Sequence, residues 1–218
     1  MSTEAPKATK GDTAHALVKA GLSALPVVGG PAVELFQLLI QPPLEQRRYE
    51  WMQCVGEKLQ ELEAQGLKLE DLQQNEQFVS AVMQASTAAL RTHKQEKLAA
   101  LRNAIIHIAK GQGAEETTQH LLLSFIDELS EMHLRVLAFS LAPKLSSGIG
   151  AGSLGHVLEQ NIPALQGKRT LYDQLWKDLY LRGLVNTESL HVMMTGNGLA
   201  QSRTSSLGES LLNLISEP

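Results

Sequence analysis

The chain of 218 residues has a single cysteine, few aromatic residues (4%) and only a small excess of acidic over basic residues. Because one cysteine, Cys54, can form neither an intramolecular disulfide nor a zinc site built from several cysteines, a disulfide-stapled protein is excluded and a cytoplasmic location is expected. With 19 Lys plus Arg against 23 Asp plus Glu, the formal net charge of -4 provides no strong positive field for nonspecific binding to nucleic acid. A hydrophobic fraction of 43% excludes wholesale disorder and suffices for a folded core.

The sequence also lacks the spacing of known catalytic and cofactor-binding motifs. None of the seven histidines is four residues from another, so no zinc-protease motif is present. The glycines of residues 150–155 match the spacing of a dinucleotide-binding loop, but a helical pattern instead of a strand precedes them, which favours a linker. Asp127 and Glu131 lie one helical turn apart near His133 and could form a carboxylate cluster, although a structural histidine is the simpler interpretation. We therefore expect no cofactor, no metal and no enzymatic activity.

The first forty residues consist of a polar tail and the most apolar part of the chain. Residues 1–12 mix small, polar and charged residues and are expected to form a mobile tail. Residues 13–40 have glycines and prolines at their centre, which argue against a transmembrane span and predict two short helices, about 13–24 and 32–40, joined by a tight turn. We expect this hairpin either to pack against the core or to be a releasable apolar element for a partner or a membrane surface. Its candidate switch residues are Pro26, Val28, Gly29, Gly30, Pro31 and Phe36.

Three further segments have helical periodicity and extend the helical domain to residue 142. The first follows Pro42-Pro43 and runs to about residue 64. The second, residues 75–110, is either one long helix or two helices abutting near His93. The third, residues 115–142, has an apolar seam typical of a helical bundle, and Pro143 ends it.

The composition changes at residues 143–155, which contain four glycines and predict a flexible linker between two domains. Beyond it, a helix ended by Gly183, a strand at 190–194, a turn at 195–198 and a final helix from about Ser206 follow the order of a winged helix in residues 156–218. The predicted fold class is therefore mainly α, with a helical bundle followed by a small winged-helix-like α+β domain. Acidic and basic side chains balance on the predicted recognition helix, so DNA is a less favoured partner than a protein or a second copy of the chain. The surface expected there consists of Tyr172, Gln174, Lys177 and Arg182.

Residues 25–35 (LPVVGGPAVEL) with 42–48 (PPLEQRR), residues 96–104 (EKLAALRNA), and residues 182–185 (RGLV) with 206–208 (SLG) together resemble bacterial proteins of the abortive-infection alpha type. The resemblance covers most of the chain and implies a role in antiphage defence, with no catalytic residue to carry over. The sequence as a whole predicts a non-enzymatic bacterial interaction protein that senses or relays infection through protein contacts in the cytoplasm, with peripheral contact to the inner membrane as an option. The alternative is a winged-helix DNA-binding transcription regulator.

Overall fold

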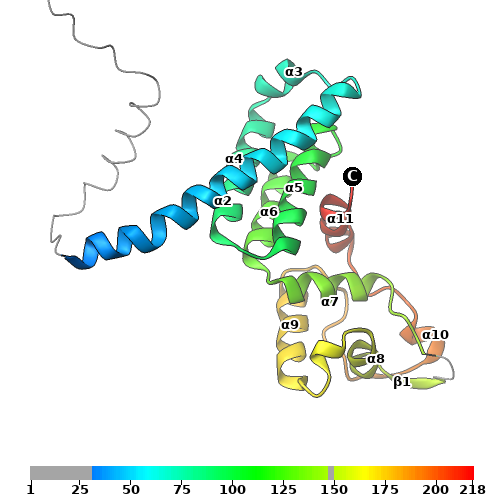
Figure 1. Cartoon of the computed structure of the whole chain (residues 1–218). Helices are drawn as coiled ribbons and strands as arrows, with labels where there is room; N and C mark the ends of the chain where they lie inside the picture. Colours follow the sequence, from blue (N-terminus) through cyan, green and yellow to red (C-terminus); the bar gives the residue numbers. More distant parts are fainter. Residues whose placement is uncertain (1–30, 147–149) are drawn as a thin grey trace, which may run out of the picture. The chain divides into compact units, whose positions relative to one another are not determined.

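The computed structural model describes residues 31–146 and 150–218, and contacts divide the chain into two units, Met1–Gln46 and Arg47–Pro218. Most of the described chain is helical, with one two-stranded antiparallel sheet (Figure 1), which confirms the mainly α fold class. The elements, in chain order, are α2 (Pro31–Ala64), α3 (Leu69–Gln73), α4 (Glu76–Arg91), α5 (Gln95–Ala109), α6 (Glu116–Glu128), α7 (Glu131–Leu141), β1 (Ala151–Ser153), α8 (Leu154–Asn161), the short 3-10 helix η1 (Pro163–Leu165), α9 (Arg169–Leu181), β2 (Met193–Thr195), α10 (Gly196–Leu199) and α11 (Ser206–Ile215).

The prediction that Pro42-Pro43 separates two helices is wrong, because α2 is one helix that contains both prolines. A proline has no N–H, so the carbonyls of Leu38 and Leu39 receive no hydrogen bond from the residue four positions later. Both residues are exposed, so this part of the helix lies at the surface and not in a dry core. The first helix and the turn of the predicted hairpin, and the tail of residues 1–12, lie outside the described residues.

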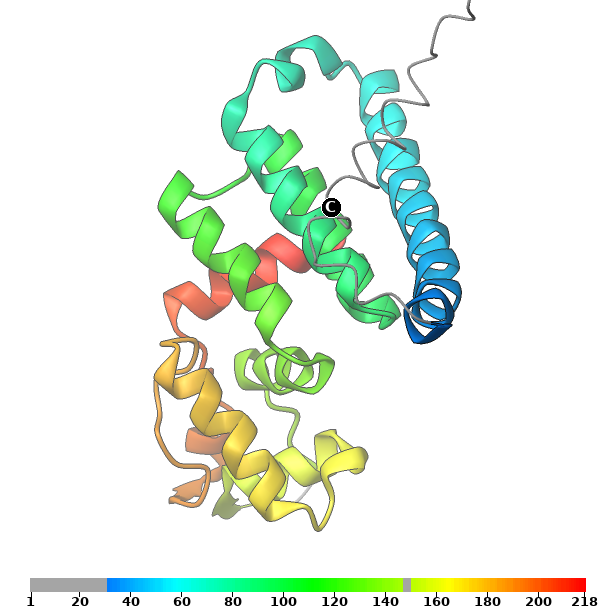
Figure 2. The ribbon, with the colours of Figure 1, turned by 90° about the vertical axis from the view of Figure 1, so that its left-hand side faces the viewer.

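Helices α4, α5 and α6 lie side by side and hold the bundle core (Figure 2). Helix α5 is buried on most of its surface, and α4 faces it with small side chains, including Ala81, Ala85 and Ala88, that allow the helices to approach closely. The extended conformation of Thr92 separates α4 from α5 and confirms the alternative of two helices that meet near His93.

The helical stretch predicted for residues 115–142 consists of two helices, because the chain breaks between α6 and α7. Leu129 leaves the helical conformation, and Ser130 then caps α7 in a capping box: its hydroxyl accepts from the His133 backbone N–H, and the His133 ring accepts from the Ser130 backbone N–H. A serine three residues before a side chain that can return this bond is a helix start signal, and it overrides the continuous apolar seam.

The sheet joins two segments that are distant in sequence. Strand β1 pairs antiparallel with β2, with Gly152 opposite Met194, and β1 leads directly into α8. The second half of the predicted linker is therefore ordered structure, and Leu154 at its end is fully buried. The strand predicted at 190–194 is present only as β2, which pairs with β1, and the Thr195 side chain caps α10 where a turn was predicted.

The C-terminal helix returns to the bundle. Helix α11 begins at Ser206, as predicted, and packs against both α5 and α7. The buried amide of Asn103 in α5 donates to the carbonyl of Ile215 at 2.9 Å, and the buried hydroxyls of Ser140 and Thr204 lie 2.6 Å apart. Residues 47–218 therefore form one unit, and the contacts place no boundary at residues 143–155.

Candidate functional site

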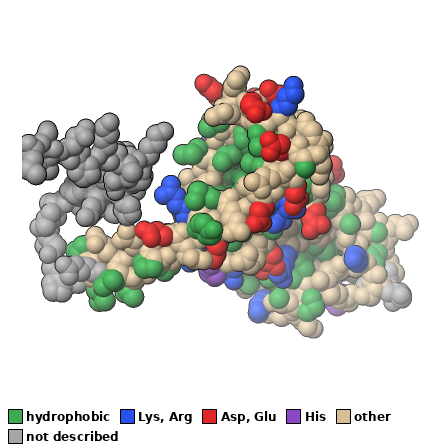
Figure 3. Space-filling model, turned by 45° about the horizontal axis from the view of Figure 1, so that its top comes forward, with side chains coloured by type: hydrophobic (Ala, Val, Ile, Leu, Met, Phe, Trp, Pro, Cys, Tyr) green, Lys and Arg blue, Asp and Glu red, His purple; other side chains and the backbone are tan. Residues whose placement is uncertain are grey.

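The first part of α2 exposes a run of large apolar side chains, which we call the apolar section, residues 33–44. Their exposed fractions range from 41% to 72%, and Figure 3 shows apolar side chains of this part of the chain open to solvent. Isolated exposed apolar residues are ordinary, whereas a contiguous group of large exposed apolar side chains is a candidate contact surface. The group consists of Val33, Leu35, Phe36, Leu38, Leu39, Ile40 and Leu44.

The second part of the same helix behaves in the opposite way. Trp51, Val55 and Leu62 are buried in the core, and the Trp51 indole donates to the Ser86 hydroxyl in α4 at 2.9 Å. Burial at intervals of three to four residues is the ordinary pattern of a helix packed on one side. The apolar section lacks such a packed side, so its exposure is a local property of residues 33–44.

Two of the six predicted switch residues lie in the described part of the chain. Pro31 is the first residue of α2, and Phe36 is 64% exposed within the apolar section. The other four, Pro26, Val28, Gly29 and Gly30, lie outside the described residues. Residues 35–40 are exposed, and because the first half of the predicted hairpin lies outside the described residues, both expected arrangements stay predictions.

The surface expected on the predicted recognition helix is only partly present on α9. Tyr172 is buried, at 4% exposure, and burial raises the pKa of its phenol, so its prediction as a surface residue is wrong. Gln174 and Lys177 are exposed, although the Gln174 amide donates to the Asp178 carboxylate at 2.7 Å. Arg182 pairs with Glu128 at 2.7 Å and lies over the Phe125 ring. Of the four residues, Lys177 is the one whose side chain is exposed and makes no hydrogen bond or ion pair in the described chain.

His133 holds the α6–α7 junction against α9. Because its Nδ1 accepts the Ser130 N–H, the ring proton of the neutral form is on Nε2, which faces an Asp178 carboxylate oxygen at 3.4 Å. Burial lowers the pKa of His133, and the nearby charge of Asp178 opposes this shift only partly. The neutral ring is therefore satisfied on both nitrogens, which is the arrangement of a structural histidine. Asp127 pairs with Arg91 and Glu131 pairs with Arg135, so the two carboxylates do not converge on His133.

A histidine–carboxylate pair that the sequence did not indicate lies in the C-terminal part. His191 Nε2 lies 2.6 Å from Asp173 Oδ1, and Asp173 also faces Arg169 at 3.5 Å. Such a pair orients an imidazole, which catalysis can use, but the His191 ring packs against Gly155, where an added Cβ would lie 3.2 Å from Cε1. The pair therefore anchors the segment before β2 to α9 and α8. The two residues are far apart in sequence and share no spacing motif.

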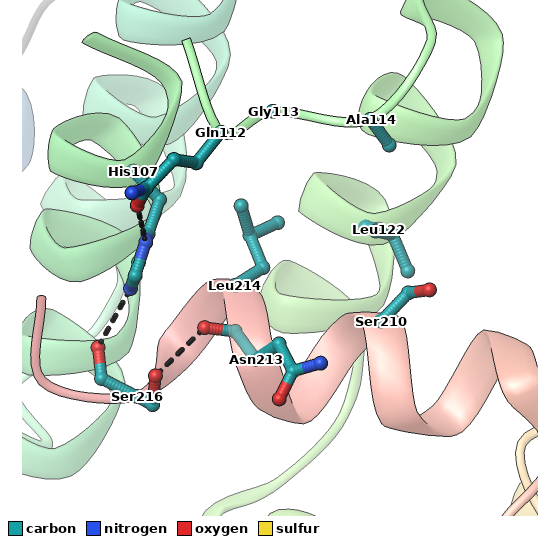
Figure 4. A pocket seen from close by; sticks show the side chains of 9 residues that line it. All are labelled: His107, Gln112, Gly113, Ala114, Leu122, Ser210, Asn213, Leu214 and Ser216. Carbon is teal, nitrogen blue, oxygen red and sulfur yellow. Dashed lines mark hydrogen bonds between the residues drawn. The ribbon is translucent and has the colours of Figure 1, made fainter. Parts of the chain in front are cut away.

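Two cavities of the described chain are lined by both polar and apolar residues, and several of the polar groups bond to one another. One, of about 470 Å³, lies between α5, α6 and α11; in it His107 contacts the Gln112 side chain at 2.8 Å and the Ser216 carbonyl at 3.3 Å (Figure 4). The other, of about 480 Å³, includes Lys97, whose ammonium donates to the Asp127 carbonyl at 2.6 Å and whose pKa burial lowers. Their polar groups serve to join helices and do not converge on a common point.

Within residues 31–146 and 150–218, no three His, Cys, Asp or Glu side chains are placed to hold a metal ion. Over the same residues, no helix has both the length and the apolar character needed to cross a bilayer. Comparison of the chain with protein-family models, curated proteins and solved structures finds no match. The resemblance to abortive-infection proteins therefore rests on the sequence stretches themselves.

Proposed function

We propose that the chain is a non-enzymatic bacterial interaction protein that acts in antiphage defence, with the apolar section of α2 as its contact element. The observation that carries the proposal is the exposure of seven large apolar side chains within twelve residues. Leaving such a surface in water is unfavourable by about 25 cal/mol for each Å² of apolar area, so a partner that covers it gains free energy. The assignment to defence comes from the resemblance of the three sequence stretches.

A catalytic role has less support. The histidines nearest to carboxylates, His133 and His191, use their rings to connect α9 with the α6–α7 junction and with the segment before β2. Neither lines one of the two cavities described above. A contact role needs no reactive group, and it agrees with the structural use of the His133 and His191 rings, which connect elements of the fold.

The test compares phage plating on bacteria that express the wild-type chain or one of two double variants. Leu38→Asp with Leu39→Asp places two charges on the apolar section, whereas Gln37→Asp with Gln41→Asp places the same two charges on its polar side. All four residues are exposed, so both variants should keep the wild-type melting temperature. We expect the leucine variant alone to lose protection. Equal protection by both variants would remove the apolar section from the function.

A winged-helix regulator remains the second candidate, favoured by the succession α8, η1 and α9 and by the pairing of β2 with β1 beside it. Its basic side chains on α9 are few, and Arg182 is engaged with Glu128. Lys177→Glu is therefore a cleaner test than a change at Arg182, which would also disturb the helix junction. Duplex DNA binding that weakens with salt and is lost in Lys177→Glu would favour the regulator over the contact protein.

A further inference from the structure

We propose that the apolar section of α2 docks on a lipid bilayer, lying in the interface without crossing the membrane. The inference rests on the proposed function, for which it names the partner. Its basis is the distribution of side chains around the helix. At about 100° per residue, the seven exposed apolar side chains cover an arc of about 240°. Gln37, Gln41 and Glu45 occupy the remaining side, where the Gln41 amide donates to the Glu45 carboxylate at 3.3 Å.

The width of this arc distinguishes a bilayer from a second copy of the chain. A helix that pairs with another helix uses an apolar stripe of roughly 100°. Pairing of two α2 helices through such a stripe would leave more than half of the apolar arc in water. A helix that lies in the interface with only its polar side toward water covers a much wider arc. The narrow polar side formed by Gln37, Gln41 and Glu45 fits that orientation.

The length and the prolines of the section determine how deep it can lie. Residues 33–44 rise about 17 Å along the helix axis, whereas the hydrocarbon core of a bilayer is about 30 Å thick. The carbonyls of Leu38 and Leu39, which Pro42 and Pro43 leave without a helical donor, would be costly in hydrocarbon, where no water can satisfy them. Both features place the section at the boundary between headgroups and acyl chains, where water and headgroups reach these carbonyls.

The charges of the chain indicate which lipids suffice. Residues 33–44 contain one charged residue, the acidic Glu34, and no basic residue, and the whole chain has a formal net charge of -4. Docking therefore depends on apolar transfer and not on attraction to anionic headgroups, so zwitterionic vesicles should be bound at least as well as anionic ones. This distinguishes the proposed interface from a basic amphipathic helix, which requires anionic lipid.

The experiment is co-sedimentation of the full-length chain with vesicles of phosphatidylcholine, alone or with one third phosphatidylglycerol, at low and high salt. We expect binding to both vesicles with little salt dependence. Leu38→Asp with Leu39→Asp should weaken it by at least about tenfold, and Gln37→Asp with Gln41→Asp should change it by less than about threefold. Because both variants add the same charge at neighbouring positions, the comparison isolates the apolar arc.

Three results would overturn lipid docking: no sedimentation with either vesicle, equal losses in the two double variants, or binding only to anionic vesicles at low salt. Light scattering of the same samples without lipid measures the oligomeric state and so tests the alternative that a second copy of the chain covers the section. A dimer that the leucine variant dissociates and the glutamine variant does not would assign the section to a second copy of the chain, which refutes lipid docking but leaves the contact function intact. The proposed contact function is refuted by a different result. That result is full phage protection by the leucine variant, whatever its effect on vesicle binding.

Discussion

Replacing Gly208 by alanine should test how tightly α11 is seated on the rest of the chain. Gly208 lies in the first turn of α11 and is buried. A Cβ built there would overlap the carbonyl oxygen of Leu184 and lie 2.7 Å from Thr204 Cγ2. The Leu184 carbonyl accepts a hydrogen bond from the Ser205 backbone N–H at 3.0 Å, so it cannot turn away without losing that bond. The methyl group therefore has to move the start of α11 away from the segment after α9.

The expected cost follows from opposing contributions. Overpacking a well-filled site costs about 1–3 kcal/mol, and a backbone neighbour that cannot yield places this site at the upper end. The higher helix propensity of alanine adds about 1 kcal/mol to the free energy of unfolding. We expect a net loss of about 2 kcal/mol in the free energy of unfolding, which for a chain of this size lowers the melting temperature by roughly 4–8 °C.

The assay is urea unfolding followed by far-ultraviolet circular dichroism, with Gly56→Ala as the matched control. Gly56 lies inside α2, and no atom lies within 4 Å of an added Cβ, so its replacement should raise the unfolding free energy by about 0.5–1 kcal/mol. A lower unfolding free energy for Gly208→Ala and a higher one for Gly56→Ala would support tight packing of α11 against the segment after α9. A Gly208→Ala chain as stable as the wild type would show that α11 moves freely enough to accept the methyl group, and the reasoning would be refuted.

Three further predictions concern single contacts and local order. Ser140→Ala should cost about 1–3 kcal/mol in unfolding free energy, because it leaves the buried Thr204 hydroxyl without its partner, and adding Thr204→Val should recover part of that loss in urea melts. Because burial lowers the native pKa of His133 below its usual 6.5, its contribution to stability is complete above pH 6.5 and is lost as the pH falls through the native pKa; His133→Gln should flatten this decline, and the exposed His120→Gln should not. Amides of residues 33–41 should exchange rapidly in water and be protected by phosphatidylcholine vesicles, and protection already in water would contradict the weak local helix argued below.

Local signals in the sequence predicted the parts of the fold that depend on neighbours along the chain. Helical periodicity located the helices, and Gly183, with φ of 70°, ends α9 at the expected place because a left-handed residue closes a helix without strain when it has no side chain. The break at Ser130 was missed although its signal was present. A serine followed three residues later by a side chain that can bond back was outweighed by an apolar seam that continues through both helices.

Pairings across long stretches of sequence could not be predicted in this way. Strand β1 and its partner β2 have three residues each and are separated by α8 and α9, so neither has enough alternation to identify the other. The bond between Asp173 and His191 is also created by the fold. Tyr172 was expected on the surface of the predicted recognition helix, but it is buried and its ring lies beside the His191 ring.

The apolar section was the hardest part to interpret, because a segment that is apolar on most sides has the same pattern whether it is buried in a protein or docked on lipid. The large apolar side chains described in this section are exposed, and the prolines add an energetic argument. Residues 33–46 contain no buried side chain among those described, so packing does not stabilise this part of α2. Isolated helices of this length are marginal in water, and each interior proline costs about 3 kcal/mol more. A helix weakened in this way gains order and apolar burial together when a surface covers it. If a surface covers the section as proposed, the two prolines make the order of the section depend on that contact.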